Sequence, residues 1–170
     1  MRHQQLWCRA SADLQQVNDA LAKARADHST LVHGDVKGAN IVFSQPPYRR
    51  QASTSSSSPL QCALYDLQYV GVGLPTHDLV YFLGTSVDSS LLTPSGELSL
   101  LAFYHDCLIE SIGDGKYTKE LLLQHWKLSL VDWYRFMAGW GFWGNDQWAE
   151  RRAKEVVGAW DAGGWDMHSR

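Results

Sequence analysis

The sequence of 170 residues predicts an α+β fold that is mostly helical and carries one short β-hairpin. Two observations predict this fold. Apolar residues recur at helical spacing over residues 11–27, 118–140 and 146–160. In contrast, β-branched and aromatic residues concentrate in two short runs, 41–43 and 62–65, which is typical of strands. We therefore expect a helical body with two strands that pair as a hairpin.

The N-terminal part predicts a helix, a polar loop and the first strand. Ser11 is suited to cap a helix that ends near Asp27. The apolar residues of this helix form one stripe: Leu14, Val17, Leu21 and Ala24. The short apolar pair Leu31-Val32 then leads into a polar segment, which the strand Ile41-Val42-Phe43 follows.

A polar insertion separates the two predicted strands. Residues 45–59 contain Pro46-Pro47 and an unbroken serine and threonine run at 53–58, so we expect a flexible loop. The cost of closing a loop grows slowly with its length, so a hairpin can carry such an insertion. The returning strand covers residues 62–65, and the glycine-rich residues 71–75 predict a further loop.

The remainder, residues 77–162, predicts a helical region. A helix begins at Thr76 or Asp78, and a second covers residues 96–111. Thr118 can cap the next helix, whose apolar residues point almost all round, so we expect most of it to be buried. Asp146 can cap a last helix that runs to about Trp160.

The composition excludes several classes of protein. Apolar residues make up 45% of the chain and charged residues 19%, which is ordinary for a globular protein. The net charge of −3 gives no basic surface for nucleic acid or for an anionic membrane. The three cysteines show no metal-binding spacing, and no apolar stretch is long enough to span a bilayer. We therefore expect a cytoplasmic protein with no nucleic-acid or membrane partner.

The polar segment after Val32 carries the residues that phosphoryl transfer requires. That reaction needs a carboxylate for the acceptor hydroxyl, divalent cations for the phosphate oxygens, and cationic groups for the γ-phosphate. Asp35 can serve as the base, and Lys37 can reach a phosphate as a point charge. Asn40, five positions after Asp35, offers a hard oxygen suited to Mg²⁺, and Asp66 can supply a metal-binding carboxylate. Because Asp66 lies beside Leu64 and Leu67, we expect it to be buried and to need a partner.

These residues resemble a family motif. His33-Gly34-Asp35 and Asn40 match H-G-D-x-x-x-x-N of the aminoglycoside phosphotransferase, choline kinase and ecdysteroid-kinase-like superfamily, which has a protein-kinase-like fold. Asp66-Leu67-Gln68 stands where these proteins have a metal-binding Asp, and residues 71–83 resemble their G-x-P-x-x-D-L-x-x-x-L stretch. Asp66-Leu67-Gln68 and Tyr81-Phe82-Leu83 favour the ecdysteroid-kinase-like branch.

The resemblance implies roles for six residues. It makes Asp35 the catalytic base, with Lys37 beside the phosphates, and it assigns Mg²⁺ binding to Asn40 and Asp66. ATP would be the phosphate donor and the hydroxyl of a small molecule the acceptor. His33 and Asp78 would support the loop structurally. A cluster of Trp140, Phe142 and Trp143 is a further candidate for an acceptor site, although buried aromatic residues are usually core.

The resemblance is strong over residues 31–83, and only 30 residues precede the motif. No glycine-rich phosphate loop or strand lysine of a kinase N-terminal lobe appears. The sequence therefore predicts, over residues 1–170, the C-terminal lobe of a kinase-like fold, with catalytic loop 31–43, insertion 45–59 and metal-binding element 62–68. Three interpretations stay open: a truncated small-molecule kinase, a non-catalytic lobe that acts as a scaffold, or a lobe completed by another chain. An exposed apolar face would accompany a missing lobe.

Overall fold

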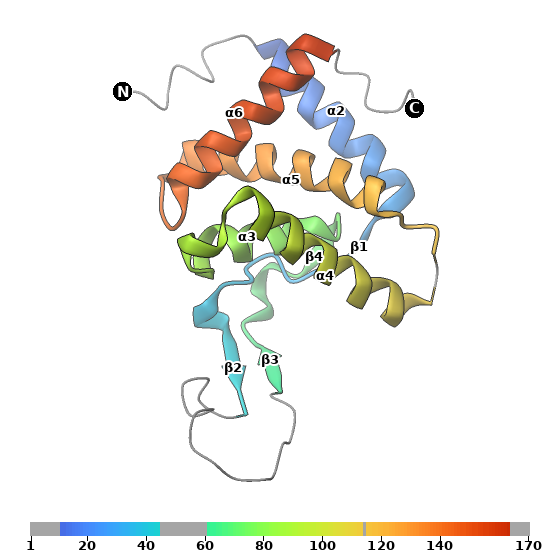
Figure 1. Cartoon of the computed structure of the whole chain (residues 1–170), viewed down its shortest axis with the longest axis vertical. Coiled ribbons are helices and arrows are strands. Elements are labelled where there is room, and N and C mark those ends of the chain that lie inside the picture. Colours follow the sequence, from blue (N-terminus) through green and yellow to red (C-terminus); the bar gives the residue numbers. More distant parts are fainter. Residues whose placement is uncertain (1–10, 45–60, 114, 164–170) are drawn as a thin grey trace.

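A computed structural model describes residues 11–44, 61–113 and 115–163. The part described is mostly helical, with small antiparallel sheets, so the expected α+β class is confirmed (Figure 1). The helices are α2 (Ser11–His28), α3 (Thr76–Ser86), α4 (Pro94–Ile112), α5 (Lys119–Trp140) and α6 (Asp146–Gly163). The insertion expected at residues 45–59 lies outside the described residues.

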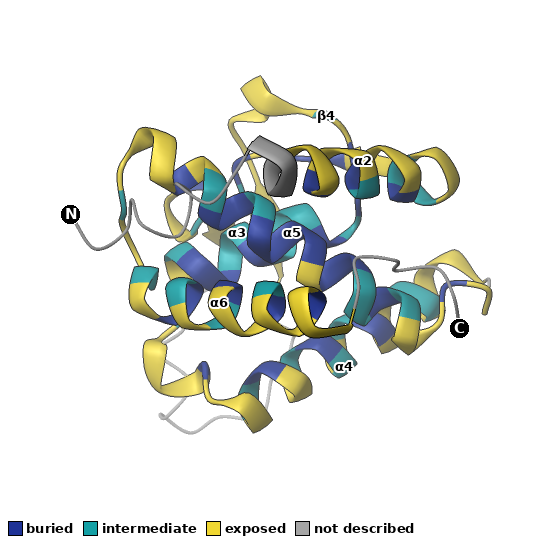
Figure 2. Ribbon diagram, turned by 90° about the horizontal axis from the view of Figure 1, so that it is seen from above, coloured by how far each residue is buried: buried dark blue, intermediate teal, exposed yellow. Residues whose placement is uncertain are grey.

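The helix α5 is the centre of the body. It contacts each of the other four helices, and ten of its residues are buried; Figure 2 shows it beneath neighbouring helices. Trp126 and Tyr134, the largest fully buried side chains, both belong to it. The all-round apolar pattern of residues 118–140 therefore predicted its position correctly, because a helix with no polar face has to be covered on every side.

Capping residues set the ends of the central helices. The side chain of Thr118 accepts a hydrogen bond from the Leu121 N–H at 3.2 Å, as a cap of α5 should. Thr93 caps α4 in the same way through the Gly96 N–H at 3.1 Å, so α4 begins two residues before the predicted start at position 96. The reason is that Pro94 fits the first turn of a helix, where its missing N–H has no partner to lose.

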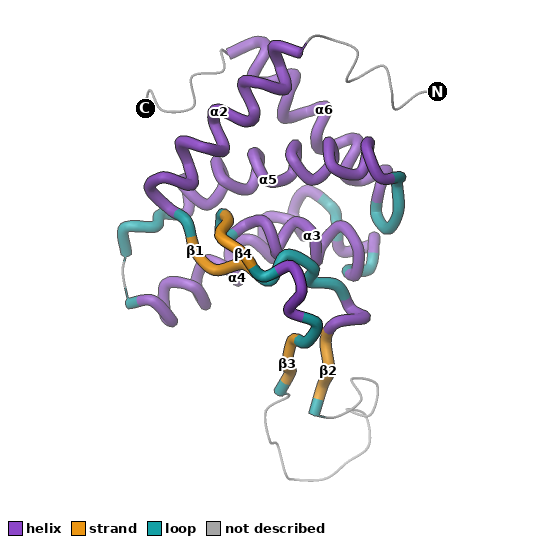
Figure 3. The backbone as a smooth tube through the Cα atoms, turned by 180° about the vertical axis from the view of Figure 1, so that it is seen from behind, coloured by secondary structure: helices purple, strands orange, loops and turns teal. Residues whose placement is uncertain are grey.

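The hairpin forms as predicted. Strand β2 (Ile41–Phe43) pairs antiparallel with β3 (Cys62–Leu64), with Ile41 opposite Leu64 and Phe43 opposite Cys62. This hairpin projects away from the helical body (Figure 3). Strand β2 directly follows the polar loop, residues 33–40. Its pairing with β3 therefore brings the C-terminal end of this loop beside the residues that follow β3.

The glycine-rich segment after residue 70 was wrongly expected to be only a loop. Gly71–Gly73 forms strand β4, which pairs antiparallel with β1 (Thr30–Val32). The partner lies about forty residues away in the sequence, so long-range pairing overrides the weak strand propensity of glycine. Close packing also requires Gly73, because a Cβ there would lie 2.8 Å from His77 Nδ1.

A buried carboxylate joins three of the helices. Glu97 of α4 is 2% exposed and accepts hydrogen bonds from the indoles of Trp126 in α5 at 3.0 Å and Trp148 in α6 at 3.2 Å. Arg152 of α6 donates from Nε and Nη2 to the same carboxylate, each at 2.9 Å. Sequence reasoning missed this cluster, which ties the C-terminal helix to the body. Among the helices described, none is both long and apolar enough to cross a bilayer.

Candidate active site

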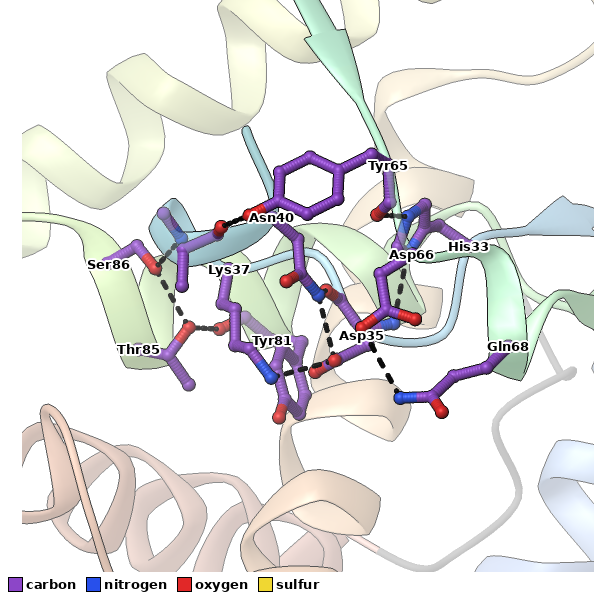
Figure 4. A network of polar contacts seen from close by, with 12 residues as sticks. His33, Asp35, Lys37, Asn40, Tyr65, Asp66, Gln68, Tyr81, Thr85 and Ser86 are labelled. Carbon is purple, nitrogen blue, oxygen red and sulfur yellow. Dashed lines mark hydrogen bonds and ion pairs between the residues drawn. The ribbon is translucent and has the colours of Figure 1, made fainter. Parts of the chain in front are cut away.

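The polar loop between β1 and β2 places three of the predicted residues together. Asp35 is 4% exposed, and its Oδ2 atom accepts hydrogen bonds from Lys37 Nζ at 2.7 Å and Asn40 Nδ2 at 2.8 Å. Asn40 Nδ2 also donates to the Asp35 backbone carbonyl at 2.9 Å. Figure 4 shows the side chains of Lys37 and Asn40 converging on the Asp35 carboxylate. Lys37 and Asn40 follow Asp35 by two and five positions in the sequence, so a single tight loop is enough to bring the three side chains together.

Helix α3 anchors the loop through Asp78. Its Oδ2 atom accepts the His33 N–H at 2.7 Å, and its Oδ1 atom accepts the Gly34 N–H at 2.8 Å. Both carboxylate oxygens therefore bind the backbone immediately before Asp35. These are the contacts expected of a residue that supports the loop.

His33 connects the loop to the end of β3. The Asp35 N–H donates to its Nδ1 atom at 3.3 Å, so the imidazole proton is on Nε2, which donates to the Tyr65 carbonyl at 3.0 Å. Both ring nitrogens are thereby occupied by backbone groups. This arrangement fits a bracing residue and leaves no ring nitrogen for proton transfer.

The environment of Asp35 favours its ionised form. Burial by itself raises the pKa of this carboxyl, but hydrogen bonds from Lys37, Tyr81 and Asn40, with the charge of Lys37, outweigh burial and lower the pKa below its ordinary value. The same contact with Asp35, opposed by burial, raises the pKa of Lys37. Asp35 is therefore a carboxylate, and Lys37 a cation, at neutral pH.

Asp66 follows β3 and differs from the expectation in its surroundings. It is exposed, and so are its neighbours Leu64 and Leu67, at 45% and 64%. The expected burial is therefore wrong: the hairpin projects from the body, so the end of β3 has no core to enter. Asp66 has φ +66° and is the one non-glycine residue with positive φ in the part of the chain described. Aspartate tolerates this conformation better than most non-glycine residues do, and non-glycine residues in it cluster at functional sites.

Backbone contacts hold Asp66 beside the loop. The Tyr65 N–H donates to the Asn40 carbonyl at 3.1 Å, and the Tyr65 hydroxyl donates to the Ala39 carbonyl. The carboxylate of Asp66 contributes to the raised pKa of Lys37, which places the two charges within electrostatic reach. In Figure 4, Asp66 accordingly lies on the same side of the loop as Asp35 and Asn40.

The oxygens of Asn40 and Asp66 fit a magnesium site. Asn40 uses its amide nitrogen on Asp35, so its carbonyl oxygen is left for another partner. Within the described ranges, no group of three His, Cys, Asp or Glu residues gathers as a complete metal cage. Mg²⁺ does not require one, since it binds through one or two protein oxygens together with phosphates and water.

Two residues of the site were quoted in the sequence motifs but were given no role there. Tyr81 lies one helical turn after Asp78; burial, together with the interaction of its hydroxyl with Asp35, raises the pKa of Tyr81 to about 12. Gly34 has φ +82°, and a Cβ there would lie 2.4 Å from the Tyr69 carbonyl oxygen. The spacing of three residues between Asp78 and Tyr81 was the available signal, because it puts both on one face of a helix.

The aromatic residues near the end of α5 separate into core and surface. Phe142 packs on Tyr134 of the core, whereas the Trp140 side chain is 80% exposed and contacts Phe136. Trp143 also contacts Phe136, and Phe136 lines a cavity between α3 and α5. Trp140 and Trp143 thus contact a residue that lines this cavity without lining it themselves, whereas Phe142 belongs to the core packing.

Comparison with models of protein families gives a match. The model of the ecdysteroid kinase-like family matches residues 3–117. The matched range contains the polar loop of residues 33–40, Asp66 and Asp78, and it ends before α5 and α6. Neither a curated protein nor a solved structure matches the chain.

Proposed function

Because the chain belongs to the ecdysteroid kinase-like family, we propose that it transfers the γ-phosphate of ATP to a hydroxyl group of a small molecule. The acceptor oxygen forms a bond to the γ-phosphorus, the bond from that phosphorus to ADP breaks, and Asp35 takes the hydroxyl proton. Bound Mg²⁺ would neutralise the phosphate oxygens during this exchange. Family membership supports a kinase-like phosphotransferase, and the assignment of donor, acceptor and residues is our proposal.

The observation that carries this proposal is the buried Asp35 carboxylate with two donors on one oxygen. Lys37 and Asn40 both bind Oδ2, so they fix the orientation of the carboxylate. Because the pKa of Asp35 is lowered, it is ionised at neutral pH and accepts a hydrogen bond from an acceptor hydroxyl. It is a weak base before the reaction, so it takes the proton only as the bond from oxygen to phosphorus forms.

The remaining residues have binding and positioning roles. We assign the Mg²⁺ ligands to Asn40 and Asp66 and phosphate contact to Lys37, and we assign support of the loop to His33 and Asp78. We further propose that the described residues are the catalytic-loop lobe of a kinase-like fold. Two antiparallel strand pairs flank the loop, and helices form the rest, which supports this proposal.

Calorimetric titration of the whole chain with ATP, with and without Mg²⁺, tests the proposal. We expect Mg²⁺-dependent binding that Asp66→Ala weakens roughly tenfold or more, because a metal-binding carboxylate is lost. Asp19→Ala, which removes an exposed carboxylate of α2, is the matched control and should bind as the natural chain does. Absence of Mg²⁺-dependent binding in the folded natural chain would refute autonomous ATP binding.

A second candidate function is a non-catalytic scaffold that binds a partner protein or a separate lobe. One observation favours it: Leu31 and Val72 lie opposite each other on the β1–β4 pair and are 74% and 73% exposed. Exposed apolar side chains next to an open strand edge are a feature of association surfaces. A scaffold of this kind would associate with no effect of nucleotide, which separates it from the first proposal.

A further inference from the structure

We propose that Ser86, the last residue of α3, is a positioning residue for the part of the polar loop that binds Mg²⁺, and that Asn145 holds Ser86 in place. The inference rests on the proposed function, because it takes Asn40 as a Mg²⁺ ligand. Ser86 Oγ accepts a hydrogen bond from the Gly38 N–H at 2.6 Å. Asn145 lies outside the range that the family model matches, so the match assigns it no role.

The Ser86 contact lies at the start of the turn that carries Asn40. Gly38–Asn40 is a 3₁₀ turn, closed by the Asn40 N–H, which donates to the Lys37 carbonyl at 2.8 Å. The first N–H groups of such a turn have no partner within it, and the side chain of the preceding residue usually accepts one of them. Lys37 holds that position, but its ammonium carries donors only and binds Asp35 instead. Ser86 therefore supplies from α3 the acceptor that Lys37 cannot provide.

A second hydroxyl group orients the oxygen of Ser86. Thr85 Oγ1 donates to the Tyr81 carbonyl at 2.7 Å, so the proton of this hydroxyl is already used. Because Thr85 Oγ1 also lies 3.1 Å from Ser86 Oγ, Ser86 is the donor in that pair. The Ser86 proton thus faces Thr85, which leaves its lone pairs for the Gly38 N–H. In Figure 4, dashed lines link Ser86 to Thr85 on one side and to the loop on the other.

Helix α3 holds the polar loop at both of its ends. Asp78, in the first turn of the helix, accepts two N–H groups from the residues just before Asp35. Ser86, at the last residue of the helix, accepts the Gly38 N–H. Asp35 and Lys37 lie between these two attachments. The helix therefore acts as one rigid support, with a separate contact for each half of the loop.

The turn that Ser86 holds carries the proposed metal ligand. Asn40 is 5% exposed, and its Nδ2 atom binds the carboxylate and the backbone carbonyl of Asp35. The Tyr65 hydroxyl donates to a carbonyl of the same turn, and Asp66 directly follows Tyr65. The two proposed Mg²⁺ ligands thus come from two segments that meet at this turn. A metal site of this kind requires its ligands to be held to within about 0.5 Å.

The end of α3 that carries Ser86 is capped by a distant residue. The Asn145 side chain donates to the carbonyls of Leu83 and Val87, each at 2.9 Å. Its backbone N–H donates to the Gly84 carbonyl at 2.7 Å. The last carbonyls of a helix have no partner within the helix, so these bonds fix its final turn. Asn145 precedes α6, and it thereby sets the place of Ser86 by binding the helix end.

Calorimetric titration of the whole chain with ATP and Mg²⁺ tests the inference. Ser86→Ala removes the acceptor and leaves no internal cavity, because Ser86 is exposed. We expect ATP to bind roughly two- to twelvefold more weakly, the value of one neutral hydrogen bond, since binding then has to order the turn. Ser86→Thr keeps the hydroxyl and should restore the natural affinity. Ser111→Ala is the matched control, because the Ser111 hydroxyl donates at 2.8 Å to a carbonyl of its own helix, and it should bind as the natural chain does.

Hydrogen exchange of individual amides, followed by NMR without nucleotide, separates a local effect from general loosening. In Ser86→Ala, the Gly38 and Asn40 amides should exchange faster. The His33 and Gly34 amides, which the other end of α3 holds, should keep their natural rates. Faster exchange at all four amides would show general loosening and overturn the positioning role.

The contribution of Asn145 has its own readout. Asn145→Ala should speed exchange at Gly38 and Asn40, because it frees the helix end that carries Ser86. Unchanged rates at these two amides would remove Asn145 from the proposal.

The remaining outcomes distinguish this inference from the proposed function. Equal ATP affinity in Ser86→Ala and the natural chain, or weak binding that Ser86→Thr does not restore, would overturn the inference and leave the proposed function intact. Absence of Mg²⁺-dependent ATP binding in the folded natural chain would remove the proposed function. The Asn40 amide then decides whether Ser86 orders the turn: faster exchange in Ser86→Ala supports that role, and unchanged exchange excludes it.

Discussion

Replacement of Asp78 by Asn should release the loop that carries Asp35. The two oxygens of Asp78 accept the backbone N–H groups of His33 at 2.7 Å and Gly34 at 2.8 Å. Asn keeps one oxygen, and its NH₂ group faces the second N–H, where no hydrogen bond can form. The substitution is nearly isosteric, so its effect reports these hydrogen bonds and the charge rather than packing.

The magnitude follows from the two bonds. A hydrogen bond to a charged group contributes about 1.5–3 kcal/mol, and one to a neutral group about 1 kcal/mol. Asp78→Asn loses one charged bond and weakens the other to a neutral one, which amounts to about 2–5 kcal/mol against local opening of the loop. At 1.4 kcal/mol per factor of ten, the protection of the two amides should fall by about 30- to 4,000-fold.

Hydrogen exchange of individual amides, followed by NMR, measures this loss directly. We expect faster exchange at His33 and Gly34 in Asp78→Asn, with the core amides of α5 unchanged. Asp88→Asn is the control, since Asp88 also accepts a backbone N–H, that of Ser90 at 2.9 Å, far from the loop in sequence. Unchanged protection at His33 and Gly34 in folded Asp78→Asn would refute the anchoring role.

Three further predictions concern stability and ionisation. Glu97→Gln should lower the free energy of unfolding by about 3–5 kcal/mol in urea titration, because it removes one partner of a buried ion pair. Lys37→Met should raise the pKa of Asp35 in a ¹³C carboxyl titration. Burial raises this pKa, and the substitution removes the hydrogen bond and the charge of Lys37 that lower it. In the natural chain, the depressed pKa of Asp35 stabilises the fold above the ordinary value of about 3.9, and this contribution is lost as pH falls through the folded-state pKa. Gly34→Ala should cost about 2 kcal/mol or more in unfolding free energy and abolish Mg²⁺-dependent ATP binding, because φ +82° strains alanine and its Cβ meets the Tyr69 carbonyl.

Each of these predictions has a matched control. Glu155→Gln removes the exposed partner of Arg152 and should cost less than about 1 kcal/mol; an equal loss would contradict the burial argument for Glu97. Lys154→Met, at a surface ion pair of α6, should leave the Asp35 titration unchanged. Gly139→Ala, where a Cβ has open space in α5, should stabilise the chain by about 0.5–1 kcal/mol. A stable Gly34→Ala that binds ATP normally would remove the steric argument.

The sequence was informative where the determining contacts are local. Asp35, Lys37 and Asn40 lie within six positions, so the chain needs only one tight loop to bring them together. Helix α5 was also predictable, because its all-round apolar pattern is a property of the segment itself. The family resemblance in residues 31–83 was confirmed by the family match over residues 3–117.

Tertiary structure decided the features that depend on distant partners. Strand β4 exists because β1 is available to pair with it, and glycine-rich residues give no local sign of that partner. Asp66 is exposed because the hairpin leaves the helical body, which its leucine neighbours could not indicate. Glu97 is buried because two indoles and Arg152 from later helices surround it.

The sequence by itself determined the mostly helical α+β class and the chemistry of the loop, since helical periodicity and short motif spacing are local properties. Only the tertiary structure decided that Tyr81 contacts Asp35 and that Trp133 lines a cavity on the same side of α3. Tyr81 and Trp133 are more than fifty positions apart in the sequence. Their approach depends on the packing of α3 against α5, which is set by the complete core rather than by either segment.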